Sequence, residues 1–150
     1  MKEMTNGRQV LVVDDDPALL KLVSAWLTAG GFTVVACDSF EDARRELALH
    51  PPDVLLTDLR LGAFNGLQLV ILAAEQKPQP LTVVMSAFDD PTLRDEAERC
   101  GARFLLKPFR ARPCLAQLGP LYDSIEHTQS INGTRSRDSR RSPPNDRSHR

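Results

Sequence analysis

The sequence VLVVDDD at residues 10–16 decides the fold, because four apolar β-formers run directly into three carboxylates. Uniformly apolar runs of this length are typical of a strand buried on both faces of a parallel sheet. A second run of the same kind, VLLTD at residues 54–58, again ends in an aspartate. Further apolar runs at residues 33–37, 81–85 and 103–106 bring the number of predicted strands to five.

Helical patterns fill the intervals between these strands. Asp16-Pro17 and Asp90-Pro91 each combine a capping side chain with a proline at the first helical position, and Ser39 is expected to cap a helix between them. Residues 58–65 are expected to form a loop before a third helix, and a fifth helix begins near Arg112-Pro113. Strands that alternate with helices predict an α/β fold, a doubly wound five-stranded parallel sheet with helices on both faces.

The length of 150 residues suggests one domain with a tail. We expect a flexible N-terminus at residues 1–7, a folded domain at 8–127 and a disordered Arg/Ser-rich tail at 128–150, where apolar residues are too few to offset the ordering entropy. The net charge is −1, but residues 131–150 carry six arginines against two aspartates, which leaves −5 for the remainder. The tail has two readings, a solubilising end or a basic arm for nucleic acid or an acidic partner.

Cysteine usage and hydropathy exclude several classes of protein. Cys37, Cys100 and Cys114 form no C-x-x-C pair, which argues against a disulfide framework and a zinc site. The N-terminus lacks the apolar run of a signal peptide, and no stretch approaches the roughly 18 apolar residues of a membrane span. We therefore expect a cytoplasmic protein with reduced thiols and no membrane partner.

Chemistry-bearing residues stand where the predicted strands end. Ligands gather beyond the carboxyl ends of the strands in an open α/β sheet. Clustered carboxylates there need compensation, which a hard cation such as Mg²⁺ and a lysine ammonium supply, and a carboxylate can itself attack phosphorus. The sequence therefore predicts a site for phosphoryl transfer to an aspartate, built from Asp14, Asp15, Asp58, Ser86 and Lys107.

The motifs Val12-Val13-Asp14-Asp15, Asp58, Ser86-Ala87 and Lys107-Pro108-Phe109 at these spacings resemble the receiver domains of bacterial response regulators. The resemblance covers residues 8–118. It implies a flavodoxin-like (βα)5 fold with strand order 2-1-3-4-5.

The resemblance also implies a role for each residue of the site. Asp58 is the phosphoacceptor, Lys107 pairs with the phosphoryl group, and Ser86 hydrogen-bonds a phosphoryl oxygen once Asp58 is modified. The expected cofactor is Mg²⁺, or Mn²⁺ in its place. Its implied ligands are Asp15 and Asp58 directly, the main-chain carbonyl of Arg60, and Asp14 through water.

Two further features follow from the resemblance. Phe104 matches an aromatic residue that turns inward as Ser86 moves toward the phosphoryl group, although an aromatic residue near a strand is also an ordinary core residue. The peptide bond between Lys107 and Pro108 is expected to be cis.

The partner implied by the resemblance is a sensor histidine kinase or phosphotransfer protein that donates phosphate to Asp58. The chain would catalyse only its own phosphorylation and dephosphorylation and would switch contacts with an unknown downstream protein. An alternative is a pseudo-receiver or scaffold that binds without phosphate. A phosphohydrolase of the haloacid-dehalogenase type would use Asp14 and Asp16, but Pro17 follows and Asp16 reads better as a helix cap.

The chain departs from the family pattern at several positions. Gly62 stands where a proline is usual, which predicts a more flexible loop. Arg60 and Phe88 flank the expected phosphoryl group, and a bulky Phe88 predicts slow attack by water. Gly119-Pro120 predicts that the fifth helix ends near Leu118. In the family, the fourth helix, fifth strand and fifth helix usually form the dimer or partner surface, so this break would alter that surface. Residues 119–150 are too few and too polar for an output domain, so we expect a stand-alone receiver.

Overall fold

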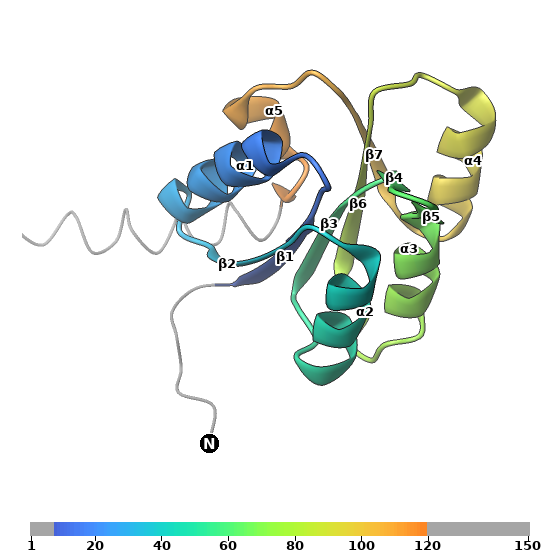
Figure 1. The fold of residues 1–150 in the computed structure, drawn as a ribbon, viewed down its shortest axis with the longest axis horizontal. Helices are drawn as coiled ribbons and strands as arrows, with labels where there is room; N and C mark the ends of the chain where they lie inside the picture. The colour runs from blue at the N-terminus through green and yellow to red at the C-terminus, as the bar shows by residue number, and fades with distance from the viewer. Residues whose placement is uncertain (1–7, 120–150) are drawn as a thin grey trace, which may run out of the picture.

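The structure, a computed structural model, describes residues 8–119 (Figure 1). The flexible N-terminus predicted at residues 1–7 and the disordered tail predicted at 128–150 lie outside the described residues. The same holds for residues 120–127, which the sequence assigned to the folded domain, and therefore for Pro120.

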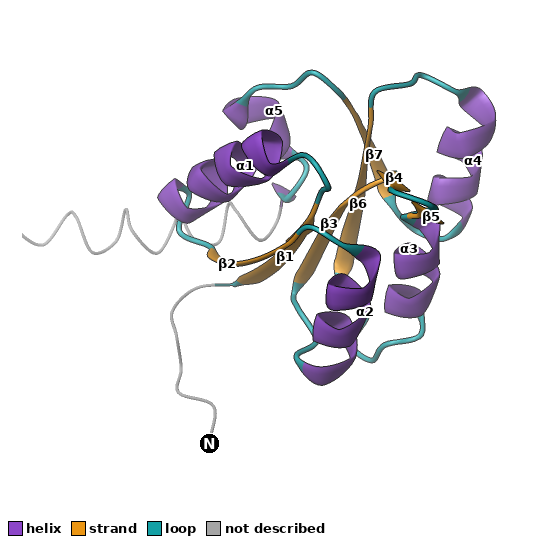
Figure 2. Ribbon diagram, viewed as in Figure 1, coloured by secondary structure: helices purple, strands orange, loops and turns teal. Residues whose placement is uncertain are grey.

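Seven strands and five helices make up the described part of the chain (Figure 2). The strands are β1 (Gln9–Val13), β2 (Thr33–Cys37), β3 (Val54–Asp58), β4 (Arg60–Leu61), β5 (Phe64–Asn65), β6 (Leu81–Ser86) and β7 (Arg103–Leu106). The helices are α1 (Pro17–Ala29), α2 (Phe40–Leu49), α3 (Leu67–Ala74), α4 (Pro91–Arg99) and α5 (Ala111–Ala116). No helix within residues 8–119 is long and apolar enough to cross a membrane.

Five of the strands form one parallel sheet in the order β2-β1-β3-β6-β7. Because β4 and β5 pair only with each other, this is the order 2-1-3-4-5 of the main strands, as the sequence predicted. Helices α1 and α5 cover one face of the sheet, and α2, α3 and α4 cover the other (Figure 1). The doubly wound α/β fold is confirmed.

The core lies on both faces of the sheet, since successive side chains of a strand point to opposite sides. Val10 and Val12 of β1 pack with α1 and α5, while Leu11 and Val13 pack with α2 and α3. All four are at most 1% exposed, which explains why this strand reads as a continuous apolar run.

The caps predicted from the sequence are present. The Asp16 side chain accepts hydrogen bonds from the backbone N–H groups of Ala18 and Leu19 and begins α1. Asp90 and Ser39 cap α4 and α2 in the same way. Each cap satisfies a backbone donor that the first helical turn leaves without a partner and contributes about 1 kcal/mol.

The region predicted as a loop at residues 58–65 is instead the antiparallel hairpin β4–β5. Leu61 pairs with Phe64 across a two-residue turn, in which Gly62 has φ +61° and Ala63 has no positive φ. A positive φ at the first central residue alone is the pattern of a type II′ turn, which favours glycine there. Gly62, which we expected to loosen this segment, supplies the backbone conformation that the turn needs.

Helix α5 is short, and the break predicted at Gly119-Pro120 extends beyond the described residues. It ends at Ala116, and Gly119 has φ +28°. The guanidinium of Arg103 on β7 donates to the Gln117 carbonyl at 2.8 Å and so satisfies an acceptor at the end of the helix.

Candidate functional site

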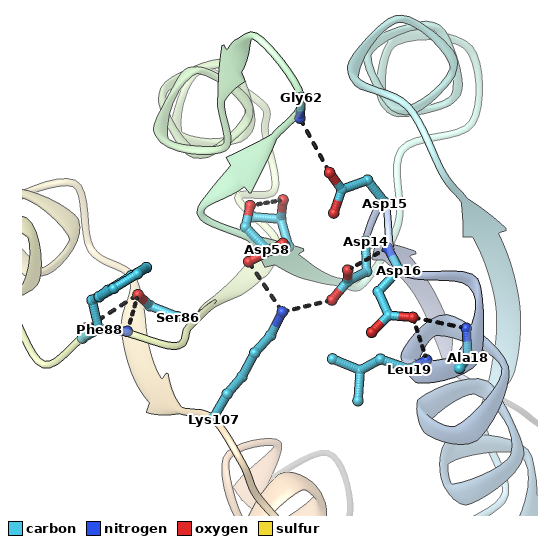
Figure 3. A network of polar contacts seen from close by, with 11 residues as sticks. Asp14, Asp15, Asp16, Ala18, Leu19, Asp58, Gly62, Ser86, Phe88 and Lys107 are labelled. Carbon is cyan, nitrogen blue, oxygen red and sulfur yellow. Dashed lines mark hydrogen bonds and ion pairs between the residues drawn. The ribbon is translucent and has the colours of Figure 1, made fainter.

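The carboxyl ends of four strands meet at one crevice (Figure 3). β1 delivers Asp14 and Asp15, the last residue of β3 is Asp58, β6 ends in Ser86, and Lys107 follows β7. Asp14, Asp58 and Ser86 are all buried, at 1%, 8% and 2% exposure. The structure therefore brings together the five residues that the sequence singled out.

Lys107 connects the two inner carboxylates of the crevice. Its Nζ lies 2.9 Å from Asp14 Oδ2 and 3.2 Å from Asp58 Oδ1. The three side chains are only 17%, 1% and 11% exposed, so water screens these contacts weakly. The ammonium group thus stands where a compact positive charge offsets the burial of two negative ones.

Burial and charge shift the pKa values of this group of residues. Burial raises the pKa of Asp58, and the neighbouring Asp14 raises it further, against the opposing effects of Lys107 and of a hydrogen bond from the Arg60 backbone. For Lys107, burial alone would lower the pKa, but the hydrogen bond to Asp14 and the charges of Asp58 and Asp14 outweigh it and raise the pKa. Lys107 is therefore a permanent cation at neutral pH.

Three carboxylates are grouped closely enough to hold a hard cation. One oxygen each of Asp14, Asp15 and Asp58 lie within 4.8 Å of one another. Both oxygens of Asp14 already have partners, the Asp16 N–H at 2.9 Å and Lys107, whereas Asp15 is exposed. This arrangement fits Mg²⁺, which prefers one or two carboxylates and retains several waters.

The hairpin leaves the Arg60 carbonyl, the predicted backbone ligand, outside its own hydrogen bonds. The Gly66 N–H donates to the Leu59 carbonyl at 2.7 Å at the base of the hairpin. Because hydrogen-bonded and non-hydrogen-bonded pairs alternate in an antiparallel ladder, the next pair, Arg60–Asn65, leaves its backbone groups outside the ladder. The Arg60 carbonyl is thus not used by the hairpin itself.

Ser86 is held away from Asp58 by the loop that follows β6. Its Oγ donates to the Phe88 carbonyl and accepts from the Phe88 N–H, both at 3.1 Å (Figure 3). The Phe88 ring is 51% exposed and lies under the Arg60 guanidinium, 4.5 Å from the ring centroid. A cation–π contact therefore links the loops after β3 and β6.

Phe104 and the Lys107–Pro108 bond complete the predicted set. Phe104 is half-buried on β7, with the Arg94 guanidinium 4.9 Å from its ring centroid. Arg94 also forms an ion pair with Asp89 at 2.8 Å. The peptide bond between Lys107 and Pro108 is cis. Sequence reasoning did not identify Arg94, because a charged residue on a helix carries no signal of which ring it covers.

The backbone around Asp58 is also specialised. The Thr57 hydroxyl is buried and donates to the Asp58 carbonyl at 3.0 Å. A Cβ on Gly66 would lie 2.0 Å from the same carbonyl oxygen, although Gly66 has an ordinary helical φ of −59°. This glycine is therefore required by close backbone approach, which no local sequence pattern reveals.

Comparison with known proteins gives one consistent result. A family model described as the response regulator receiver domain matches residues 10–118. The regulatory protein VirG of Agrobacterium fabrum is 33% identical over 112 residues, which are 74% of this chain and 44% of that protein. The response regulator protein FleR of Pseudomonas aeruginosa is 36% identical over 108 residues, 71% of this chain and 23% of that protein. The chain thus spans less than half the length of these curated relatives.

Solved structures agree on the fold. The chemotaxis response regulator CheY4 of Vibrio cholerae matches with a TM-score of 0.70 and 23% identity, over 77% of this chain and 98% of that one. A CheY-like receiver domain protein from Methanospirillum hungatei matches with a TM-score of 0.73 and 20% identity, over 81% and 98%.

Proposed function

The chain belongs to the response regulator receiver domain family, and from that premise we propose that it accepts a phosphoryl group on Asp58. The observation that carries the proposal is the position of Asp58 between the Lys107 ammonium, at 3.2 Å, and the carboxylates of Asp14 and Asp15. Burial and the neighbouring carboxylates destabilise the ionised form of Asp58, and Lys107 offsets this only in part. Such a position is costly for a purely structural carboxylate, whereas a nucleophile that receives an anionic group needs positive charge beside it.

The proposed donor is a phosphohistidine of a sensor histidine kinase or phosphotransfer protein. An oxygen of the Asp58 carboxylate forms a bond to phosphorus as the phosphorus–nitrogen bond breaks. The imidazole leaves with the bonding electron pair and takes up a proton from solvent. The chain would thus catalyse its own phosphorylation and, with water as the acceptor, its own dephosphorylation, but no reaction of another substrate.

Different residues of the crevice would each stabilise the negative charge of the phosphoryl group. Lys107 holds its proton and offers its ammonium to a phosphoryl oxygen, while Ser86 Oγ would exchange its bonds to Phe88 for one to the same group. Asp15, Asp58 and the Arg60 carbonyl would hold Mg²⁺ or Mn²⁺, with Asp14 acting through water. When bound, the cation neutralises charge on the transferring phosphoryl group.

We also propose a switching role for Phe104 and for the surface around it. Release of Ser86 from Phe88 would move the loop that carries Asp89 and thereby the Arg94 guanidinium that covers Phe104. Leu106 on the edge strand β7 is 39% exposed, which supports this surface as the contact for a downstream protein or a second copy. Three free thiols and the implied kinase support a cytoplasmic location.

The deciding experiment is Mg²⁺-dependent labelling of the full chain with acetyl phosphate. Wild type and Asp38→Ala, which removes an aspartate just after β2, should be labelled, and Asp58→Ala should not. Labelling of Asp58→Ala equal to wild type would refute the assignment. Failure to label any of the three would favour a module that binds partners without phosphate.

A further inference from the structure

The hairpin β4–β5 is fixed to the rest of the fold at three places. Leu61 is 3% exposed and packs in the core between the sheet and helices α2 and α3. The Phe64 ring stacks on Phe40 at the start of α2, with ring centroids 4.8 Å apart and planes 11° from parallel. The Arg60 guanidinium lies over Phe88 at 4.5 Å. These contacts make the hairpin a braced element.

The tip of this hairpin reaches a carboxylate of the acidic cluster. The backbone N–H of Gly62 donates to Asp15 Oδ2 at 3.3 Å, across 47 positions of sequence. In Figure 3 this oxygen lies on the side of Asp15 away from Asp14 and Asp58, and the other oxygen faces them. The hydrogen bond therefore orients Asp15 and leaves its other oxygen facing Asp14 and Asp58.

We propose that hairpin β4–β5 is a positioning element for the divalent-cation site, in which Gly62 orients Asp15 and the Phe40–Phe64 stack holds Gly62 in place. The inference rests on the proposed function, since it assumes that Asp15 is a cation ligand. Partners that hydrogen-bond a metal-ligating side chain fix its orientation and strengthen binding. The same hairpin carries the Arg60 carbonyl, so it would position two of the proposed cation ligands, the Asp15 carboxylate and the Arg60 carbonyl.

Glycine is the residue that this role requires. A proline at position 62 has no N–H to donate and cannot adopt φ +61°. Asparagine keeps the N–H and tolerates a left-handed conformation better than other side chains. A Cβ at Gly62 would meet no atom within 4 Å, so the substitutions differ in the hydrogen bond and the turn and not in crowding.

The test is calorimetric titration of Mg²⁺ into the full, unphosphorylated chain. Phe64→Ala, which touches none of the carboxylates, should bind Mg²⁺ about three- to tenfold more weakly, below the range of about 10- to 100-fold for direct partners of metal ligands. Phe64→Tyr keeps the stacked ring and should bind as wild type. Ile71→Ala is the matched control, since Ile71 on α3 is 50% exposed and Phe64 is 45% exposed.

A second pair of variants tests the hydrogen bond itself. Gly62→Pro should weaken Mg²⁺ binding at least as much as Phe64→Ala, and Gly62→Asn should stay within about twofold of wild type. Amide hydrogen exchange at residue 62 should be faster in Phe64→Ala than in wild type. This measurement reports how firmly the Phe40–Phe64 stack holds the Gly62 N–H, and it needs no metal.

The outcomes separate the two proposals. The inference would be overturned if wild type binds Mg²⁺ and Phe64→Ala has the same Mg²⁺ affinity and the same amide exchange as wild type. That result would leave the proposed function intact. Wild-type protein that binds no Mg²⁺ would overturn the metal part of the proposed function instead.

Discussion

At the scale of single residues, Lys107 determines the charge state of the crevice. Its ammonium is 2.9 Å from Asp14 and 3.2 Å from Asp58, and both carboxylates are buried. Removing one partner of a buried pair leaves the other charge without compensation, which is costly. The Lys107 contacts lower the pKa of Asp58 against the effects of burial and of Asp14.

We predict that Lys107→Met raises the pKa of Asp58 further and destabilises the fold by about 2–4 kcal/mol at pH 7. Carboxylates whose folded pKa is raised cost stability once the pH is above their unfolded pKa. The loss should therefore shrink as the pH falls toward 4 and they become protonated. Carbon-13 NMR titration and urea unfolding measure both effects, with Lys107→Arg as the charge-retaining control. An unchanged pKa of Asp58 in Lys107→Met would contradict this account.

Gly66 gives a second prediction at this scale. Alanine would place its Cβ 2.0 Å from the Asp58 carbonyl oxygen, a backbone atom that cannot move without displacing Asp58 itself. Gly66→Ala should destabilise by about 3 kcal/mol or more, at the upper end of the cost of overpacking. Gly30→Ala is the comparison, because the nearest atom to its Cβ is the movable end of the Leu115 side chain at 3.0 Å, and the nearest backbone atoms are at an ordinary 3.4 Å. It should lose less than about 1 kcal/mol. Equal losses in urea unfolding would refute the explanation.

The same residues show how far sequence reasoning reaches. Asp14, Asp58 and Lys107 could be placed at one crevice because parallel strands end at the same edge of the sheet. The hydrogen bond from the Gly62 N–H to Asp15 and the close approach of Gly66 to the Asp58 carbonyl could not be predicted. Both involve backbone groups, which are the same in every sequence. The bond from Gly62 to Asp15 depends on contacts between segments 47 positions apart.

At the scale of elements, a cation–π contact joins the segment that follows Asp58 to the loop after β6. Ser86 is hydrogen-bonded to the backbone of Phe88, and the Phe88 ring lies under Arg60. We expect the bulky Phe88 ring, held by Arg60, to hinder water that attacks a phosphoryl group on Asp58. A phosphorylated form that lasts longer than seconds is therefore expected.

We predict that Phe88→Ala loses phosphate about two- to fivefold faster than wild type, the equivalent of one exposed cation–π contact of about 0.5–1 kcal/mol. Phe88→Tyr keeps the ring and should lose phosphate at the wild-type rate. Release of inorganic phosphate from protein labelled with acetyl phosphate measures both rates. A half-life of a few seconds in wild type, or no change in Phe88→Ala, would count against the covering role.

The elements differ in how well the sequence predicted them. Helices α1, α2 and α4 begin at the capping residues expected, because a cap is a local contact within one turn. The hairpin was missed because its strands are two residues long and carry no alternating pattern. Its stability comes from Leu61 and Phe64, which pack against α2 at a distance in sequence.

At the scale of the whole molecule, alkaline pH should destabilise the fold. Burial raises the pKa of the Cys114 thiol to about 11. Burial also raises that of Cys37 to about 11, with help from Glu46, Asp42 and Asp38. The unfolded thiols ionise first as the pH rises above 9, so the folded state binds more protons and the free energy of unfolding falls. The raised pKa of Lys107 acts in the same direction at higher pH.

We predict that the free energy of unfolding decreases between about pH 9 and pH 11. The decrease should be about 1.4 kcal/mol for each unit by which the pKa of Cys114 in the folded state exceeds that in the unfolded state. Urea titrations at a series of pH values measure the slope. Cys114→Ala should flatten it, whatever its effect on stability at pH 7, and Ile71→Ala, which removes an exposed side chain without a titrating group, should not. A slope that is the same in Cys114→Ala as in wild type would contradict the role of this thiol.

The architecture of the whole domain followed from the sequence because all five strands are nearly uniform in apolar character. A sheet buried on both faces demands that pattern, and helices on both sides supply the burial.

The grouping of three carboxylates around one ammonium sets how the crevice chooses among ions. Lys107 cancels one of the charges of Asp14, Asp15 and Asp58, so two negative charges remain within a few ångströms. A potassium ion would leave the crevice negative, whereas a doubly charged ion brings it to neutrality at short range, where attraction is strongest. We therefore expect the crevice to select ions by valence before ionic radius, so that abundant monovalent salt competes poorly for it.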